Sequence, residues 1–529
     1  MNSKFVLFLA LLLTTQIAFL HSQEQTGQRI IEDASTVYVI REIDFDVQGR
    51  SRPFALIYHG EFKYGERIIG RQNLDRYLAL KRQLLIDQRV LEEVRIEYLL
   101  GEREADGALP VRLQIYVRDT WNFIVLPYPE YNSNDGFSLT LKARHYNFLG
   151  TMSPLRVDLG YSQNDGEHEF NFMIESHTPF YFAGHKWNFR FDHDLSYILD
   201  EPLYYRNVTG LSVRLPWQET VITVGFNQFL IVNEENSDRD IEMFDLPDRF
   251  DGVYASTELF TSMQIPLGLE ISDFGQLRYT PRLSGRINYP YNLMDDSRKP
   301  VTTFSHSLGF GRVHWIGNFR RGLSASISNS NSWYFDRDDA PLRIDLSCDL
   351  SFYWPLTSFM GFSSRLNYRQ WWHWSDRIGD YIPHFTSGDK IRGVINRDIR
   401  AFQILTLNLD FPIRVLRFWP SEWFDNQRLR LFDFEMQFSP FTDLALFQGP
   451  YNRLKDRRNP YDTTTTFSLD DMINTAGLEV YVHPGFFRAL KIRGSVGYNL
   501  RRIRDDGLSL RWGFFPAWDE IFIGLNFHY

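Results

Sequence analysis

The chain has 529 residues and a net charge of −9, from 57 Lys and Arg against 66 Asp and Glu, and 16% of its residues are aromatic. Because phosphate contacts require clustered Lys and Arg, a mildly acidic chain without a basic tract is not expected to bind nucleic acid. The single cysteine, Cys348, excludes an intramolecular disulfide framework and any zinc or iron–sulfur site that needs several cysteines.

The first 22 residues have the layout of a secretory signal peptide. Lys4 supplies a positive charge, the apolar run Phe5–Leu13 follows it, and the small Ser22 lies near a plausible cleavage site. The alternative is an N-terminal membrane anchor, but polar residues interrupt the apolar stretch. Further along the chain, no window approaches the roughly 18–20 apolar residues that a membrane-spanning helix needs. We therefore expect an exported protein with a signal peptide at 1–22 and a linker at 23–35.

Residues 36–120 combine strand and helix patterns within a short stretch. Apolar residues recur at period two in three segments, and at helical spacing in two others that contain no Gly or Pro. The order strand–helix–helix–strand–strand is long enough to build a small core of its own, so we expect one small α+β domain. The strand patterns lie at 39–47, 94–100 and 111–117, and the helical patterns lie at 54–57 and 71–88.

From Trp121 to the end of the chain, apolar and polar residues alternate in run after run. In Ile344–Trp354, for example, every second residue is apolar, and the residues between them are Asp, Ser and Tyr. Two architectures produce this pattern. A soluble sandwich or propeller buries the apolar faces in a core, whereas a transmembrane barrel turns them toward lipid and satisfies its backbone by closure.

Three features favour the transmembrane barrel. Many alternating runs are 9–11 residues long, tryptophans lie where runs begin and end, and brief connections contrast with long charged ones such as 233–251. At about 25 residues for each strand and its connection, residues 121–529 predict about sixteen antiparallel strands. The tryptophans expected in interfacial girdles are Trp187, Trp217, Trp315, Trp333, Trp354, Trp371, Trp372 and Trp374.

Short motifs along the barrel carry a family resemblance. Asn147–Phe148–Leu149–Gly150 is similar to an Asn-aromatic-Leu-Gly motif at a barrel start, and Ile391–Arg392–Gly393 is similar to a Val-Arg-Gly motif on a long loop. In this order, the motifs resemble those of the BamA/TamA-like outer-membrane insertase superfamily, also called the bacterial surface antigen family. Its members join periplasmic POTRA domains to a sixteen-strand barrel. The residues that resemble the outer-membrane signal of a last strand are Phe522, Gly524, Leu525, Phe527 and Tyr529.

The resemblance implies a role for the Arg-Gly pair. Residues 36–120 would be one POTRA domain, and Arg392 would lie on a loop folded into the barrel lumen, where it would meet Asp410 and Asp443 on the next two strands. Alternation independently points Asp410 inward. A guanidinium forked onto carboxylates is a strong, directional contact, suited to pinning a loop. The chain departs from the family pattern at Val394, where an aromatic is usual, and at Ala445, where glycine is usual.

The resemblance also implies a function, which is assembly or insertion of other barrels into the bacterial outer membrane through a weak seam between the first and last strands. The alternatives are a transporter of a specialised protein or lipid cargo and a passive porin-like channel. Expected partners are outer-membrane lipids, unfolded outer-membrane protein clients and periplasmic chaperones or lipoproteins. No catalytic or cofactor motif is present, so an enzyme is not expected. Residues that would weaken pairing near the barrel ends are Pro154, Gly513, Pro516 and Gly524.

Overall fold

The computed structural model describes most of the chain beyond residue 35. The predicted signal peptide, the whole charged segment 233–251 and Tyr529 lie outside the described residues. Those residues are 36–132, 136–164, 167–199, 203–232, 253–271, 275–291, 300–335, 342–374, 385–386, 391–394, 400–451, 463–465, 467–488, 490–501, 503, 510–511, 515–516 and 521–527.

The N-terminal segment forms a four-stranded sheet with the strand order β2-β1-β4-β3 and two helices. The predicted α+β arrangement is confirmed, and the structure adds the three-residue strand β2, which is too short to show a period in the sequence. Apolar residues at the predicted strand and helix positions are buried, among them Ile40, Leu74 and Leu113. The elements are β1 (Val37–Gln48), α2 (Pro53–His59), β2 (Arg67–Ile69), α3 (Arg71–Asp87), β3 (Leu91–Leu100) and β4 (Leu109–Asp119).

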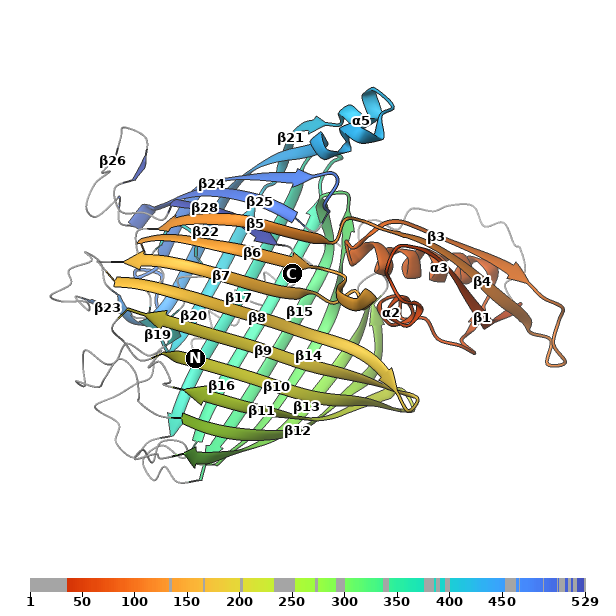
Figure 1. Cartoon of the computed structure of the whole chain (residues 1–529), viewed down its shortest axis with the longest axis horizontal. Coiled ribbons are helices and arrows are strands. Elements are labelled where there is room, and N and C mark those ends of the chain that lie inside the picture. The colour runs from red at the N-terminus through yellow and green to blue at the C-terminus, as the bar shows by residue number, and fades with distance from the viewer. Residues whose placement is uncertain are drawn as a thin grey trace. The chain divides into compact units, whose positions relative to one another are not determined.

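The rest of the chain forms a closed barrel of antiparallel strands (Figure 1). Consecutive strands are neighbours, and the last strand, β28, lies beside the first, β5. The first half of the barrel consists of β5 (Phe123–Asn132), β6 (Gly136–His145), β7 (Leu155–Asn164), β8 (Glu167–Phe182), β9 (His185–Ile198), β10 (Tyr204–Trp217), β11 (Thr220–Val232), β12 (Val253–Ile271) and β13 (Gly275–Tyr291). The second half consists of β14 (Val301–Ile316), β15 (Phe319–Tyr334), β16 (Leu342–Pro355), β17 (Gly361–Trp374), β20 (Gln403–Asp410), β21 (Ile413–Phe418), β22 (Phe434–Tyr451), β24 (Ile473–Pro484), β25 (Leu490–Asn499) and β28 (Ile521–Phe527).

Counting β20 and β21 as one interrupted strand, because both pair with β22, the described residues make eighteen barrel strands. This exceeds the predicted sixteen because each strand with its connection occupies fewer residues than the roughly 25 assumed for such barrels. An even number still places both barrel ends on one side. Short additional pieces are β18 (Phe385–Thr386), β19 (Arg400–Ala401), β23 (Thr463–Thr465), β26 (Leu510–Arg511) and β27 (Phe515–Pro516).

The barrel is apolar outside and polar inside, as a membrane-spanning barrel requires. On β12, Leu259 is 63% exposed, whereas Ser256, on the opposite face, is fully buried. Glu258, also on the inner face, accepts hydrogen bonds from Asn227 and Arg282 on the strands either side. No helix in the described part of the chain is long and apolar enough to cross a membrane.

Two of the tryptophans expected in the interfacial girdles point into the barrel. Trp372 is exposed on the outer face, but its neighbour Trp371 donates to Asp345 at 2.5 Å and packs against a buried interior cluster. Adjacent residues of a strand face opposite sides, so these two cannot share a girdle. Trp315 lines an interior cavity. The girdle prediction is therefore wrong for Trp371 and Trp315.

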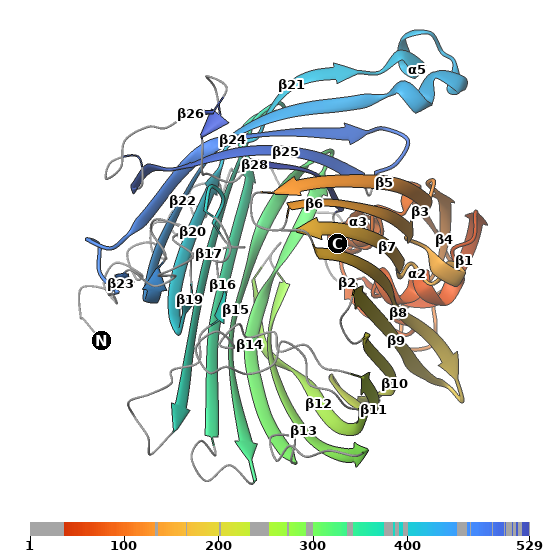
Figure 2. The same ribbon diagram turned by 60° about the vertical axis from the view of Figure 1, so that its left-hand side comes forward.

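The two ends of the barrel differ in where the longest connections lie. β8 and β9, like β14 and β15, are joined by two residues at one end, whereas the connections from β11 to β12 and from β17 to β20 at the other end are long. The chain enters the barrel at β5 and leaves it at β28 on the end with short turns, since the strands are antiparallel and even in number. Figure 2 shows the strands of the wall from a second side.

The lone cysteine tests the polarity of the wall. Cys348 shares a face with Leu346 and pairs across the strands with Ile327, which is exposed on the outer face. A water-soluble maleimide should therefore not label Cys348 in protein reconstituted into lipid vesicles. In a Cys348→Ser background, Asp349→Cys lies on the lumen face and should be labelled. The mass shift on a denaturing gel measures both, and equal labelling rates would contradict the assignment.

Candidate functional site

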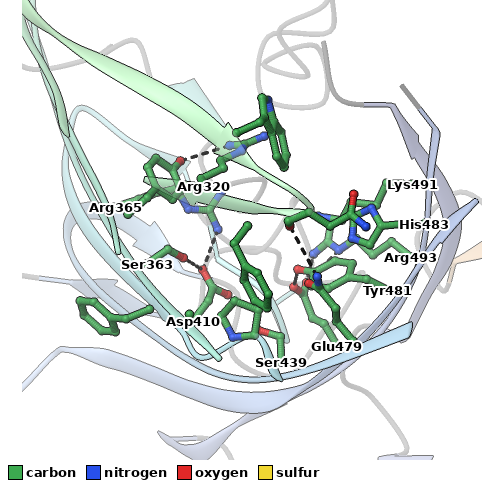
Figure 3. A pocket seen from close by; sticks show the side chains of 18 residues that line it. Arg320, Ser363, Arg365, Asp410, Ser439, Glu479, Tyr481, His483, Lys491 and Arg493 are labelled. Atoms are coloured by element: carbon green, nitrogen blue, oxygen red, sulfur yellow. Dashed lines mark hydrogen bonds and ion pairs between the residues drawn. The ribbon is translucent and has the colours of Figure 1, made fainter. Parts of the chain in front are cut away.

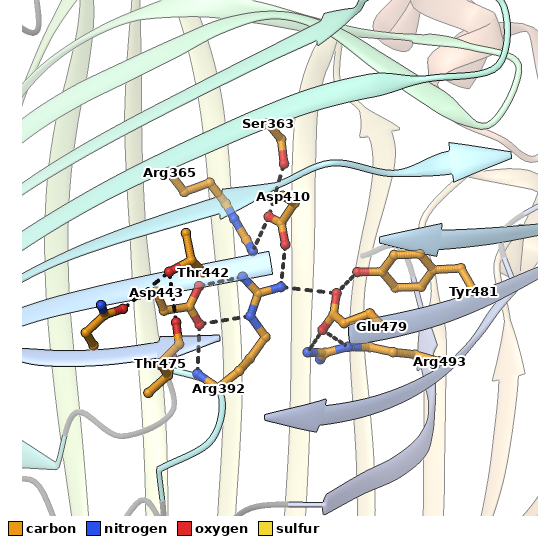
Figure 4. Close-up of polar contacts among 11 residues, drawn as sticks. Ser363, Arg365, Arg392, Asp410, Thr442, Asp443, Thr475, Glu479, Tyr481 and Arg493 are labelled. Atoms are coloured by element: carbon orange, nitrogen blue, oxygen red, sulfur yellow. Dashed lines mark hydrogen bonds and ion pairs between the residues drawn. The ribbon is translucent and has the colours of Figure 1, made fainter. Parts of the chain in front are cut away.

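Arg392 lies inside the barrel, on the described piece of the loop between β17 and β20 (Figure 4). Its Nε and backbone N–H both donate to Asp443 Oδ2 at 2.9 Å, and Nη2 donates to Asp443 Oδ1 at 2.5 Å. Nη1 donates to Asp410 and lies 3.1 Å from Glu479 Oε2. The guanidinium also lies over the Phe441 ring, 3.8 Å from its centroid. One side chain therefore connects the loop to three strands of the barrel wall.

Each carboxylate reaches the lumen because it occupies an inward position of an alternating strand. Asp410 ends β20, Asp443 lies in β22, and Glu479 lies in β24. Two wall arginines complete the set, since Arg365 lies 3.3 Å from Asp410 and Arg493 donates to Glu479 at 2.8 Å. With Arg392, three guanidinium groups face three carboxylates, and the network is electrically balanced.

The balance matters because the acids are buried. Asp443 is fully buried and Glu479 is 1% exposed. A buried carboxylate that loses its partner is strongly destabilising, whereas a satisfied one is tolerated. The structure brings together the predicted Arg392, Asp410 and Asp443. Sequence reasoning missed Glu479, although its inward place in the alternating run of β24 is a signal that could have identified it.

Glycine at position 393 is needed for two separate reasons. Its φ is +78°, in the left-handed region that side-chain-bearing residues rarely adopt. A Cβ at this position would lie 2.8 Å from the backbone of Gly497 and Tyr498 in β25. Gly497 is constrained in return, since a Cβ there would lie 2.7 Å from Gly393. The loop backbone thus packs directly on the backbone of the wall.

An apolar cluster flanks the salt-bridge network. Ile391 and Val394, on either side of the Arg-Gly pair, are 1% and 3% exposed. Val394 and Ala445, the two departures from the family motifs, are both members of this cluster, so their small side chains pack in the same interior region. The other members are Ala401, Ile404, Phe447 and Ile473, with Trp371 packed against them.

A cavity of about 340 Å³ adjoins the network in the lumen (Figure 3). Asp410 and Glu479 line it together with four cations, of which Lys491 lies over the Tyr481 ring at 3.6 Å and Arg320 contacts aromatic rings. Among the described residues, no group of His, Cys, Asp and Glu has an arrangement that could hold a metal ion. The cavity is a polar, slightly basic part of the lumen.

The motif predicted at the barrel start forms the turn between β6 and β7, two strands into the barrel. Phe148–Gly150 is a single 3₁₀ turn, in which Leu149 and Gly150 have positive φ. The buried Asn147 side chain accepts a hydrogen bond from the Met152 N–H at 2.9 Å and closes the turn. Its residues therefore shape a connection, and the barrel starts earlier, at β5.

The predicted C-terminal signal lies on the closing strand. Phe522, Gly524, Leu525 and Phe527 belong to β28, which pairs with β25 over seven residues and lies beside β5, while Tyr529 is outside the described residues. Of the four residues proposed to weaken the seam, Gly524 lies on β28, and two others lie elsewhere. Pro154 precedes β7, Pro516 belongs to the side hairpin of β26 and β27, and Gly513 is not described.

The first strand, β5, lacks backbone donors on the edge that closes the barrel, a feature that sequence reasoning missed. The Tyr146 N–H donates to the Asn122 carbonyl at 2.8 Å, so even-numbered residues of β5 point their backbone groups toward β6. Odd-numbered residues point theirs toward β28. Pro127 and Pro129 are both odd-numbered and have no N–H. The edge of β5 that closes the barrel therefore lacks two neighbouring donors.

No protein-family model matches the chain, and no curated protein matches it in sequence. Solved structures do match. CdiB from Acinetobacter baumannii is 13% identical with a TM-score of 0.47, covering 93% of this chain and 74% of that one. BamA from Haemophilus ducreyi lacking POTRA domains 1–3 is 13% identical with a TM-score of 0.37, covering 94% and 85%. CdiB from Escherichia coli is 11% identical with a TM-score of 0.40, covering 97% and 95%.

The chain is similar to these barrels. Because these three TM-scores are below 0.5, the functional conclusion rests on the chain's own geometry.

Arg392→Ala should destabilise the folded barrel. It leaves Asp443 and Glu479 buried with fewer cationic partners, and breaking such a buried pair typically costs about 3–5 kcal/mol. Arg392→Lys keeps the charge and loses the fork, so its effect should be intermediate. Arg156→Ala removes a half-exposed barrel ion pair with Glu175 and is the control. The temperature at which gel mobility changes measures all three, and equal values for Arg392→Ala and Arg156→Ala would contradict the role of the network.

Gly393→Ala should also destabilise the barrel, and a matched variant separates its two causes. Gly268 has a similar φ of +71°, but a Cβ there would meet nothing within 4 Å. Gly268→Ala therefore reports the backbone cost alone, about 1–2 kcal/mol for a left-handed residue. The same gel assay should show a larger loss for Gly393→Ala, because its Cβ also displaces the wall. Similar losses would mean that the close packing on Gly497 is unimportant.

Proposed function

We propose that this protein is a non-enzymatic assembly factor that inserts β-barrel clients into the bacterial outer membrane, with its N-terminal α+β domain in the periplasm. The observation that carries the proposal is the closing edge of β5, where Pro127 and Pro129 remove two donors from the side on which β28 lies. A strand edge with unmet pairing capacity is a template for another strand.

The mechanism follows from what an incomplete seam leaves unpaired. Each net backbone hydrogen bond contributes about 0.5–1.5 kcal/mol, so two missing donors lower the cost of separating β5 from β28. Within lipid, backbone groups need partners inside the protein. A client strand that pairs with the opened edge of β28 would satisfy those groups by β-augmentation. The seam would thus stay open only while a client strand is paired with the edge of β28.

The loop network supports a gated barrel more than an open channel. Arg392 is held by three wall carboxylates, so the described piece of the loop at 391–394 lies in the lumen. Opening of a passive pore would require that balanced network to break, which is costly. The same network would keep the wall from β20 to β25 rigid while the seam moves. Expected partners remain membrane lipids, unfolded barrel clients and periplasmic chaperones or lipoproteins.

Restoring the missing donors should slow the proposed activity. Pro127→Val with Pro129→Val supplies two N–H groups to the seam and keeps the residues apolar. We expect higher thermal stability and slower folding of a client barrel into vesicles that contain the variant. Pro281→Val in β13, on the far wall, is the control because it adds a donor away from the seam. The rate of appearance of heat-modifiable client measures activity, and unchanged rates would contradict the seam mechanism.

Two further measurements separate the alternatives. Large, steady conductance of the purified protein in a planar bilayer would replace the proposal with a porin-like channel. If depletion of the protein leaves other barrel proteins at normal levels, general assembly is wrong, and transport of a specialised protein or lipid cargo becomes the function to test.

A further inference from the structure

One connection at the short-turn end of the barrel is unlike its neighbours. Between β21 and β22 the chain forms α5 (Pro420–Trp423) and a 3₁₀ helix, Gln427–Phe432, whereas the β8–β9 turn has two residues. Figures 1 and 2 both show α5 extending beyond the strand ends. The large apolar side chains of this tip are strongly exposed. They are Trp423 at 59%, Phe424 at 70%, Leu431 at 67% and Phe432 at 61%.

Specific hydrogen bonds and ring contacts hold the tip in a defined conformation. Asp433 is 3% exposed, and its carboxylate accepts hydrogen bonds from the backbone and hydroxyl of Ser421, which ties the two ends of the tip together. Asn426 caps the 3₁₀ helix by accepting from the Arg428 N–H at 3.0 Å. Phe418 packs edge-on against Trp423 at 5.1 Å between ring centroids. The remaining apolar groups are therefore held outward by specific contacts, and an exposed apolar patch of this kind marks an interaction surface.

The patch continues the lipid-facing wall. Phe438 on β22 and Phe411 beside β20 are exposed on the outer face, and Val415 and Leu416 extend that apolar surface along β21 toward the tip. On β21, Leu416 and Phe418 pair with the apolar Met436 and Phe434 of β22, so the apolar face continues to the start of the tip. The two arginines of β21, Arg414 and Arg417, lie opposite the buried Gln437 and Glu435, on the other face. The outer face of the wall contacts the membrane lipids. Because the apolar surface continues from the wall to the tip, lipid is also the favoured partner of the tip.

We propose that residues 419–433 bind the membrane leaflet at the short-turn end, as an interfacial wedge. Trp423, Phe424, Leu431 and Phe432 insert at the level of the headgroups, a depth at which Trp is favoured. Arg428, which is exposed on the same tip, reaches lipid phosphates, as basic side chains beside an apolar interfacial face do. The proposal depends on the barrel spanning a membrane and is independent of the client-insertion function.

A single label tests the depth of the wedge. Phe424→Cys in a Cys348→Ser background is labelled with a fluorophore and reconstituted as one copy per lipid nanodisc. Nitroxide-bearing lipids quench from within the bilayer, and iodide quenches from water. We expect shallow nitroxide to quench the label at least about twofold more than deep nitroxide, as for an interfacial segment, with little quenching by iodide.

Two control sites calibrate the result. Leu259→Cys lies on the lipid-facing wall and should be quenched by lipid nitroxide, whereas Tyr64→Cys, 59% exposed on the N-terminal domain, should be quenched by iodide. A label at Phe424 that behaves like the Tyr64 site overturns the proposal. Protection from both quenchers also overturns it, since the tip would then be covered by protein. Phe432→Cys repeats the measurement if Phe424→Cys does not show heat-modifiable folding.

Discussion

The salt-bridge network around Arg392 is the contact on which the interior of this barrel depends. The wall pairs Arg365 with Asp410 and Arg493 with Glu479, and Arg392 adds the third positive charge, next to the fully buried Asp443. Because a buried carboxylate without a partner is strongly destabilising, the wall depends on the arginine that the loop supplies. The segment 391–394 is therefore an integral part of the barrel interior.

The network also explains why the neighbouring residues are small. Gly393 lets the loop backbone approach Gly497 closely enough for Arg392 to reach three strands at once. Val394 and Ala445 belong to the apolar cluster beside it. A Cβ at Gly393 would meet the backbone of Gly497 and Tyr498, and so push the segment that carries Arg392 away from the wall. The Gly393–Gly497 contact, the apolar cluster and the salt-bridge network therefore form one unit. The close backbone packing determines where the charge of Arg392 lies.

The closing edge of β5 differs from the Arg392 network. The network gives each of its charged groups a partner, whereas Pro127 and Pro129 leave the backbone pairing of β5 incomplete. The network ties β20, β22 and β24 together, whereas the two prolines lie on the edge of β5 where the barrel closes. The exposed tip after β21 adds an apolar surface to the same wall, at the end where the chain enters and leaves the barrel.

The sequence by itself determined the transmembrane barrel, the α+β segment before it, and the inward direction of Asp410. These follow from short-range periodicity, because alternation decides which face of a strand each side chain occupies. It underestimated the number of strands, because connection lengths carry no period. Only the tertiary structure decided that Glu479 joins Arg392, that Trp371 faces inward while Trp372 faces outward, and that two prolines lie on the closing edge. Those facts depend on register, the alignment of strands distant in sequence, and no local pattern records it.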